Sequence, residues 1–141
     1  MHLVPLPASH RDLFEGDACV VLTTLMPDGQ PQVTPVWSNL DRDFVLINTM
    51  RGFRKEKNLR ANPKVTLLAY RPAQPLRHIE IRGIVANMTE TGALEHLDAL
   101  TQLYLHRPEA HFFGECVPAD LQGTYIPVKI TIVPTHVRVE G

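Results

Sequence analysis

The chain has 141 residues, of which 44% are hydrophobic and 21% are charged, and its formal net charge is −1 at pH 7. This composition is that of a globular protein and excludes an intrinsically disordered chain. The charge excludes a general attraction to nucleic acid, and no apolar run approaches the roughly 20 residues that cross a bilayer. The length fits one domain, expected over 1–141, and the first residues do not resemble a secretory signal, so we expect a cytoplasmic protein.

The first elements predicted along the chain are a short helix and a hairpin. The helix is expected over 9–14, capped by Ser9 and ended at Gly16. Two segments rich in β-branched residues follow, 18–26 and 31–38, and both are typical of strands. The sequence between them, Pro-Asp-Gly-Gln, is typical of a tight turn, because proline presets φ and glycine tolerates positive φ. The two strands are therefore expected to pair.

Two prolines restrict the place of the second strand in the sheet. Pro31 and Pro35 cannot donate ladder hydrogen bonds, so this strand is expected at an edge or a bulge. The polar segment 39–43 predicts a turn, and the apolar segment 44–49 predicts a third strand.

The remainder of the chain alternates between helical and strand patterns. Residues 53–61 predict a short charged helix. Strands are expected over 65–70 and 78–86, the second from its alternation of polar and apolar residues. A longer helix is predicted over 90–106, where leucines recur at helical spacing. The final segment, 125–139, alternates again and is long enough to bend around a barrel.

Short turns join most of these six strands, which favours an antiparallel sheet. A curled antiparallel sheet removes its edges by closing. The sequence therefore predicts a mainly β fold: a six-stranded antiparallel split β-barrel with short helices.

The sequence gives little support to metal-dependent or nucleophilic chemistry. His106 and His111 are five residues apart, a spacing that does not put two metal ligands on one helix face. Ser9 and Ser38 lie outside any nucleophile-elbow sequence. Cys19 lies in an apolar strand and is expected to be buried. No metal site is predicted, and no catalytic residue is assigned.

Positive charge is concentrated in one segment. Of the 14 lysines and arginines, six fall close together: Arg51, Arg54, Lys55, Lys57, Arg60 and Lys64. They follow the third predicted strand, where a helix starts and offers free N–H groups to a phosphate. With Lys55 from this group, the side chains of Asn48, Thr49 and Asn58 would form an anion-binding site; the alternative is a solvated helix face. Aromatic residues make up 6% of the chain, which gives no support to RNA binding.

Trp37 is the single tryptophan of the chain and ends the second predicted strand. One interpretation is an anchor in the core or in an interface. The other is a flat wall against a planar ring system.

Two motifs, taken in order, resemble a known family. Segment 23–37, Thr-Thr-Leu-Met-Pro-Asp-Gly-Gln-Pro-Gln-Val-Thr-Pro-Val-Trp, is similar to the opening hairpin of the pyridoxamine 5′-phosphate oxidase-like, FMN-binding split barrels. Segment 48–65 is similar to the Thr…Lys-x-x-Asn-Leu-Arg…Asn-Pro-x-Val stretch of their deazaflavin-dependent oxidoreductase branch. Residues 79–83, Ile-Glu-Ile-Arg-Gly, resemble the strand that follows, and the whole resemblance covers about residues 10–140.

The resemblance implies a homodimer with a cofactor site at the interface. Carried over by position, it implies that the cofactor phosphate is held by Asn48, Thr49, Lys55 and Asn58, with Arg54 and Lys57 nearby. It also implies that the cofactor ring is lined by Pro35, Val36 and Trp37.

The activity that the resemblance implies is hydride transfer between the deazaflavin coenzyme F420 and a small unsaturated organic substrate. The cofactor would supply the chemistry, which agrees with the absence of a recognisable acid–base pair. An FMN-dependent oxidase or reductase on the same fold is the alternative, and a non-enzymatic flavin- or haem-binding protein is a second. The longer pyridoxamine phosphate oxidases carry an additional C-terminal segment that grips pyridoxal phosphate, so vitamin B6 oxidation is not expected.

Overall fold

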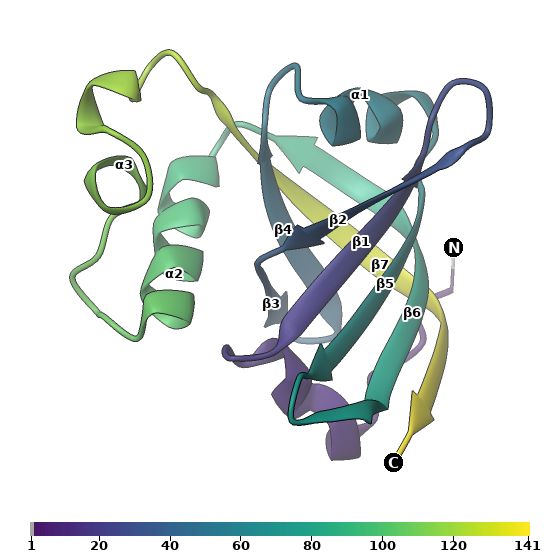
Figure 1. Cartoon of the computed structure of the whole chain (residues 1–141). Helices are drawn as coiled ribbons and strands as arrows, with labels where there is room; N and C mark the ends of the chain where they lie inside the picture. Colours follow the sequence, from purple (N-terminus) through teal and green to yellow (C-terminus); the bar gives the residue numbers. More distant parts are fainter. Residues whose placement is uncertain (1) are drawn as a thin grey trace.

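Apolar side chains at alternate positions of most strands are buried and form one common core. The computed structural model, which describes residues 2–141, is shown in Figure 1. A 7-stranded antiparallel sheet has the order β2-β1-β5-β6-β7-β4-β3. Its strands are β1 (Cys19–Leu25), β2 (Pro31–Val36), β3 (Ser38–Asp41), β4 (Phe44–Met50), β5 (Lys64–Arg71), β6 (Gln74–Thr89) and β7 (Pro127–Glu140). The predicted mainly β fold, an antiparallel split barrel with short helices, is confirmed.

Five short helical elements accompany the sheet: η1 (Ala8–Phe14), α1 (Arg54–Ala61), α2 (Ala93–Leu105), α3 (Phe112–Glu115) and η2 (Ala119–Leu121). In Figure 1, α1 lies across one end of the barrel, whereas α2 and α3 stand beside it, next to β3 and β4. No helix among residues 2–141 is long and apolar enough to cross a membrane.

The predicted number of six strands is wrong by one, because the segment expected to be a turn contains a strand. Residues 38–41 form β3, which pairs with β4 from Ser38↔Ile47 to Asp41↔Phe44. The turn itself shrinks to Arg42 and Asp43, and Arg42 takes the left-handed conformation, with φ of 56°, that such a tight turn requires. Polar residues in 39–43 therefore mark an edge strand as well as a turn.

The second strand lies at an edge of the sheet, as its prolines predict. Among the described strands, β2 pairs with β1 alone, in a register that places Val21 opposite Pro35 and Leu25 opposite Pro31. The side of β2 away from β1 needs no ladder donors, so the prolines cost no hydrogen bond there.

The opening helix differs from its prediction in type and cap. It is a 3-10 helix whose N-cap is Pro7, and the hydroxyl of Ser9 lies 2.8 Å from His10 Nδ1, so the prediction of Ser9 as the cap is wrong. Asp12 fastens this helix to the β5–β6 hairpin through Arg71 and Arg77, at 2.5 and 2.8 Å. These two guanidinium groups hold the pKa of the Asp12 carboxyl well below its usual range.

Gly83 allows the two longest strands to bend around the core. The register of β6 against β7 shifts between Arg82 and Gly83. A Cβ at residue 83 would lie 2.7 Å from Ile132 Cγ2 and 2.8 Å from the carbonyl oxygen of Val133. Only glycine permits this close approach, and the bulge it forms curves the sheet.

Most of the buried apolar residues form two separate clusters. The first fills the barrel and includes Phe14, Leu22 and Ile81. The second is smaller and joins Met50 of β4 to Leu97 of α2 and Phe113 of α3. The α2–α3 unit, defined here as residues 93–117, is thus packed on the barrel through its own cluster.

Candidate functional site

A cavity of about 660 Å³ lies between the barrel and the α2–α3 unit. Its walls come from β1, β2 and β4 on the barrel side, from the start of α1, and from α2 and α3. This volume lies within the range of small-molecule and cofactor sites.

The residue between β2 and β3 forms one wall of this cavity. β2 ends at Val36 and β3 begins at Ser38, yet these strands are the two opposite edges of the sheet. Trp37 alone therefore spans the opening of the split barrel, and its indole lines the cavity.

Tyr104 of α2 holds this junction in place. Its ring stacks on Trp37 with a centroid distance of 5.3 Å and an interplanar angle of 12°. The hydroxyl accepts a hydrogen bond from the Ser38 N–H at 3.1 Å and donates one to the Ser38 carbonyl at 3.2 Å. Tyr104 thus replaces the missing neighbour strand for one residue of the open edge.

The aromatic wall continues into α3. Phe112 meets Trp37 edge to face, with a centroid distance of 6.5 Å and an angle of 86°. Trp37, Tyr104 and Phe112 thus present a contiguous apolar surface, which suits contact with a planar ring.

The opposite end of the cavity is polar. Asn48 and Thr49 at the end of β4, and Lys55 in the first turn of α1, line it. Burial lowers the pKa of the Lys55 ammonium, and no carboxylate among residues 2–141 lies within salt-bridge distance of it. A partly buried, unpaired ammonium group of this kind favours an anionic ligand.

The start of α1 adds free N–H groups to the same end. Its N-cap, Phe53, makes no side-chain capping bond, so the first N–H groups of the helix lack a side-chain partner. The carboxylate of Glu56 accepts a hydrogen bond from the Gly52 N–H at 2.8 Å and pairs with Arg60. This contact fixes the turn that leads from β4 into the helix.

The structure brings six of the nine predicted site residues to the cavity and leaves three outside it. Those that line the cavity are Pro35, Val36, Trp37, Asn48, Thr49 and Lys55. Arg54 and Lys57 are exposed on α1, and Arg54 donates to Asn58 at 3.3 Å.

The side chain of Asn58, a residue of α1, is buried and forms hydrogen bonds with other residues of the chain. Its Nδ2 group lies 3.0 Å from Thr24 Oγ1 and 3.3 Å from Gln32 Oε1. These bonds tie α1 to the β1–β2 hairpin and so place Lys55 over the cavity.

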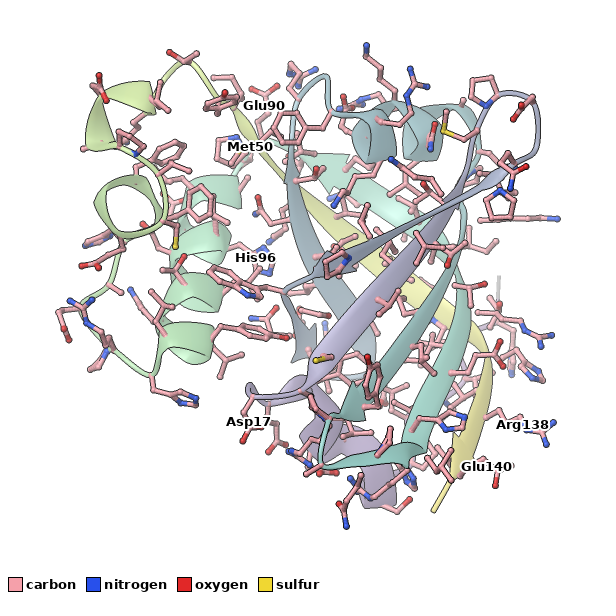
Figure 2. The ribbon with its side chains drawn as sticks, in the orientation of Figure 1. Asp17, Met50, Glu90, His96, Arg138 and Glu140 are labelled. Atoms are coloured by element: carbon pink, nitrogen blue, oxygen red, sulfur yellow. The ribbon has the colours of Figure 1, made fainter. Side chains whose placement is uncertain are left out.

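A buried polar chain connects α2 to the barrel, and Figure 2 shows His96 on the side of α2 that faces the barrel. Asn48 Nδ2 donates to the Ala93 carbonyl at 2.9 Å and to His96 Nδ1 at 3.1 Å. His96 Nε2 then donates to Asn39 Oδ1 at 2.9 Å. Asn48 Oδ1 is left buried without a hydrogen-bond partner.

His96 and Phe112 were not among the predicted site residues. His96 follows Ala93 by three positions and precedes Leu100 by four, so helical spacing placed it on the buried face. Phe112 lies in a segment for which the sequence predicted no element.

Cys19 was expected to be buried, but it is half-exposed and lines the cavity, because it points outward at the start of β1. Among residues 2–141, no group of three or more His, Cys, Asp or Glu side chains is placed to hold a metal ion.

The chain resembles known proteins over most of its length. The family model described as pyridoxamine 5′-phosphate oxidase matches residues 6–120. A solved structure named F420 reductase is 25% identical to the chain, with 94% of this chain and 98% of the other covered and a TM-score of 0.77. No curated protein matches the chain.

Two further structures show the fold alone. The conserved hypothetical protein Rv2991 from Mycobacterium tuberculosis is 24% identical, with 96% and 84% coverage and a TM-score of 0.68. General Stress Protein 26 from Bacillus anthracis is 21% identical, with 89% and 86% coverage and a TM-score of 0.61.

The buried chain through His96 predicts a pH dependence of stability. Burial, with a smaller contribution from the charge of Lys129, lowers the pKa of His96 from 6.5 to about 4. Between pH 6.5 and 4, His96 is protonated in the unfolded chain but stays neutral in the folded protein. The free energy of unfolding therefore falls as the pH drops from 6.5 to 4. The loss due to this group is up to about 3 kcal/mol, and above pH 6.5 the group has no such effect.

Urea unfolding at pH 7.5 and 4.5, for the wild type and for His96→Gln, measures this effect. We expect the wild type to lose more stability than the variant between the two pH values. The other titrating groups are common to both proteins and cancel in the difference. An equal loss in both would show that His96 does not titrate as described.

Proposed function

Because the chain belongs to the pyridoxamine 5′-phosphate oxidase family, we propose that it is an oxidoreductase that transfers a hydride between coenzyme F420 and a small unsaturated organic substrate. The observation that carries this proposal is the division of one cavity into a cationic end at Lys55 and an aromatic wall at Trp37. A phosphate-bearing coenzyme with a planar ring needs both features. The likeness to the solved F420 reductase supports this coenzyme.

The residues at the cationic end fit a phosphate group. The ammonium of Lys55 is partly desolvated and unpaired, and Thr49, whose side chain carries a hydroxyl, also lines the cavity. Together with the first N–H groups of α1, they form a donor set without a competing carboxylate. These groups would hold the phosphate. Arg54 and Lys57, exposed on the first turn of the same helix, would face the acidic tail of the coenzyme.

The chain's own residues bind and orient the cofactor. When bound in its reduced form, the coenzyme would supply a hydride to the unsaturated substrate and become oxidised, and water would supply the proton that completes the product. Pro35, Val36 and Trp37 would line the ring, and the apolar side chains of α2 and α3 would exclude water from it. Asn58 and Glu56 would not contact the cofactor; they fix the position of α1, which carries Lys55.

FMN is the second candidate cofactor, because the matching family model is that of pyridoxamine 5′-phosphate oxidase. The same donor set would hold its phosphate, and the activity would then be that of an FMN-dependent oxidase or reductase. A protein that binds flavin or haem without turnover is the third candidate.

Parallel titrations with F420 and FMN, followed by the fluorescence of each cofactor, separate these candidates. We expect saturable binding of both at one site per chain, with tighter binding of F420, because Arg54 and Lys57 add positive charge beyond the phosphate site. Preference for FMN would move the protein to the FMN-dependent class. Binding of neither would refute the proposed function.

Lys55→Ala tests the cationic end directly. Removal of its ammonium is expected to weaken binding of the preferred cofactor by about 1–3 kcal/mol, the range for loss of a charge-assisted hydrogen bond. Isothermal titration calorimetry measures this change. Lys64→Ala, which removes an exposed lysine outside the cavity, is the matched control and should leave the affinity unchanged. An unchanged affinity for Lys55→Ala would exclude Lys55 from the site.

We also propose that the protein is a homodimer, as the family resemblance implies. The outer face of β2, β1 and β5 carries an uncharged surface formed by Cys19, Val21, Thr23, Pro31, Val33, Pro35, Thr66, Leu68 and Tyr70. The side chains of Val33 and Leu68 are 59% and 36% exposed. On the next strand, β6, this face turns charged at Glu80 and Arg82. An apolar surface with a polar rim is typical of a protein interface, and this one borders the cavity at Cys19 and Pro35.

Light scattering at micromolar concentration measures the oligomeric state. We expect a mass of twice 15.9 kDa for the wild type and the monomer mass for Val33→Glu, because a charge would be buried in the interface. Leu76→Glu is the control: Leu76 is 84% exposed and lies outside this surface. A monomeric wild type would contradict the proposed dimer.

A further inference from the structure

The walls of the cavity carry very little charge. Among the described residues that line it, Lys55 is the only one with a charged side chain, and it belongs to the α1 end. The end formed by the α2–α3 unit and the adjoining Trp37 contains no carboxylate, guanidinium or imidazole. Its polar groups are the phenol of Tyr104 and the thiol of Cys116.

These two groups also remain neutral. Burial raises the pKa of the Tyr104 phenol. Burial, together with the nearby charge of Glu115, raises the pKa of the Cys116 thiol. The Tyr104 hydroxyl is moreover used by the backbone of Ser38. The described residues of the α2–α3 end therefore offer no positive charge to an anionic ligand.

The wall formed by α3 is held by polar contacts made outside the cavity. Asp98 of α2 accepts a hydrogen bond from the Phe112 N–H at 2.9 Å and another from His111 Nδ1 at 3.0 Å. Arg107 makes a bidentate ion pair with Glu115, at 2.7 and 3.0 Å. These contacts set the position of Phe112 relative to α2.

The other side of this end is equally well defined. Trp37 is stacked on Tyr104, and Tyr104 is bonded to both backbone groups of Ser38. Phe112 and Trp37 meet at nearly a right angle, so they form a corner of two aromatic surfaces. A flat ligand in this corner would contact one ring face to face and the other at its edge.

We propose that the α2–α3 end of the cavity binds the substrate, that this substrate is a neutral, flat, conjugated molecule, and that Phe112 determines this specificity. The assignment of the ligand as a substrate rests on the proposed function. Its binding to the aromatic corner does not, because the corner exists without a cofactor.

The neutral character follows from the cost of desolvation. An ionised carboxylate or sulfonate at this end would lose its hydration and find no partner charge. A neutral conjugated molecule loses little hydration and gains contact with both rings. Lys55, the one cationic residue among the described residues that line the cavity, lies at the other end, where it would bind the phosphate of the cofactor.

The fluorescence of Trp37 reports on binding, because Trp37 is the single tryptophan of the chain and lines the cavity. Two flat nitroaromatic probes of similar size, neutral 4-nitroanisole and anionic 4-nitrobenzoate, quench indole fluorescence on contact. Each is titrated into the protein without cofactor, and again with saturating F420 or FMN, whichever binds. No reductant is present, so neither probe reacts.

We expect saturable quenching by 4-nitroanisole and an affinity at least tenfold lower for 4-nitrobenzoate. Phe112→Ala and Phe112→Leu should weaken binding of 4-nitroanisole about fivefold or more, a change of about 1 kcal/mol that is within the range of an aromatic pair. The leucine variant keeps an apolar side chain against the α2–α3 cluster, so it tests the corner even if the alanine variant folds poorly. Leu105→Ala, an exposed apolar residue of α2 outside the cavity, is the control and should bind as the wild type does.

Equal affinity for the two probes in Lys55→Ala, absence of saturable quenching, or unchanged binding by both Phe112 variants would overturn the proposal. Where 4-nitrobenzoate binds to the cofactor-free protein, loss of that binding in Lys55→Ala assigns it to the cationic end and supports the division of the cavity. Discrimination between the probes by a protein that binds neither cofactor would support this inference while refuting the proposed function.

Discussion

The opening of the sheet at Trp37 is the constraint on which the rest of the site depends. The two edge strands of the sheet follow each other in the chain, so one residue must cross from one edge to the other. On its side away from β4, the backbone of Ser38 has no neighbouring strand among the described residues, and the hydroxyl of Tyr104 bonds both its N–H and its carbonyl group. α2 is therefore docked at the opening, and the cavity is the space that remains between it and the barrel.

The sequence predicted the parts of the fold that depend on local chemistry. Prolines at 31 and 35 placed β2 at an edge, and the basic segment after β4 predicted α1, whose Lys55 lines the cavity. The helix predicted over 90–106 is shorter, Ala93–Leu105, because Gly92 and His106 take left-handed conformations at its two ends. Each of these features is decided within a few residues.

The features that the sequence did not predict depend on contacts between distant segments. β3 is a strand because β4 is placed beside it, and its polar residues Asn39 and Asp41 are compatible with either a strand or a turn. Phe112 reaches the cavity because Asp98, fourteen residues earlier, caps the start of α3. The role of Asn58 shows the converse case: its type fits a phosphate ligand, yet the hairpin across from α1 offers Thr24 and Gln32 as partners. Similar side chains serve ligands and structure, and only the tertiary arrangement separates the two uses.

The two apolar clusters also bear on the dynamics of the protein. The barrel cluster and the α2–α3 cluster have no member in common, and Met50 on β4 is the barrel's contribution to the smaller one. Local opening in proteins follows such contiguous packed units, with the smaller unit opening at lower free energy. Amide protons of α2 and α3 should thus exchange with solvent through partial unfolding, while those of β5, β6 and β7 await global unfolding. The α2–α3 wall of the cavity would then open as a unit of its own. A ligand bound against this wall would slow hydrogen exchange of the α2 and α3 amides and leave exchange in the barrel interior unchanged.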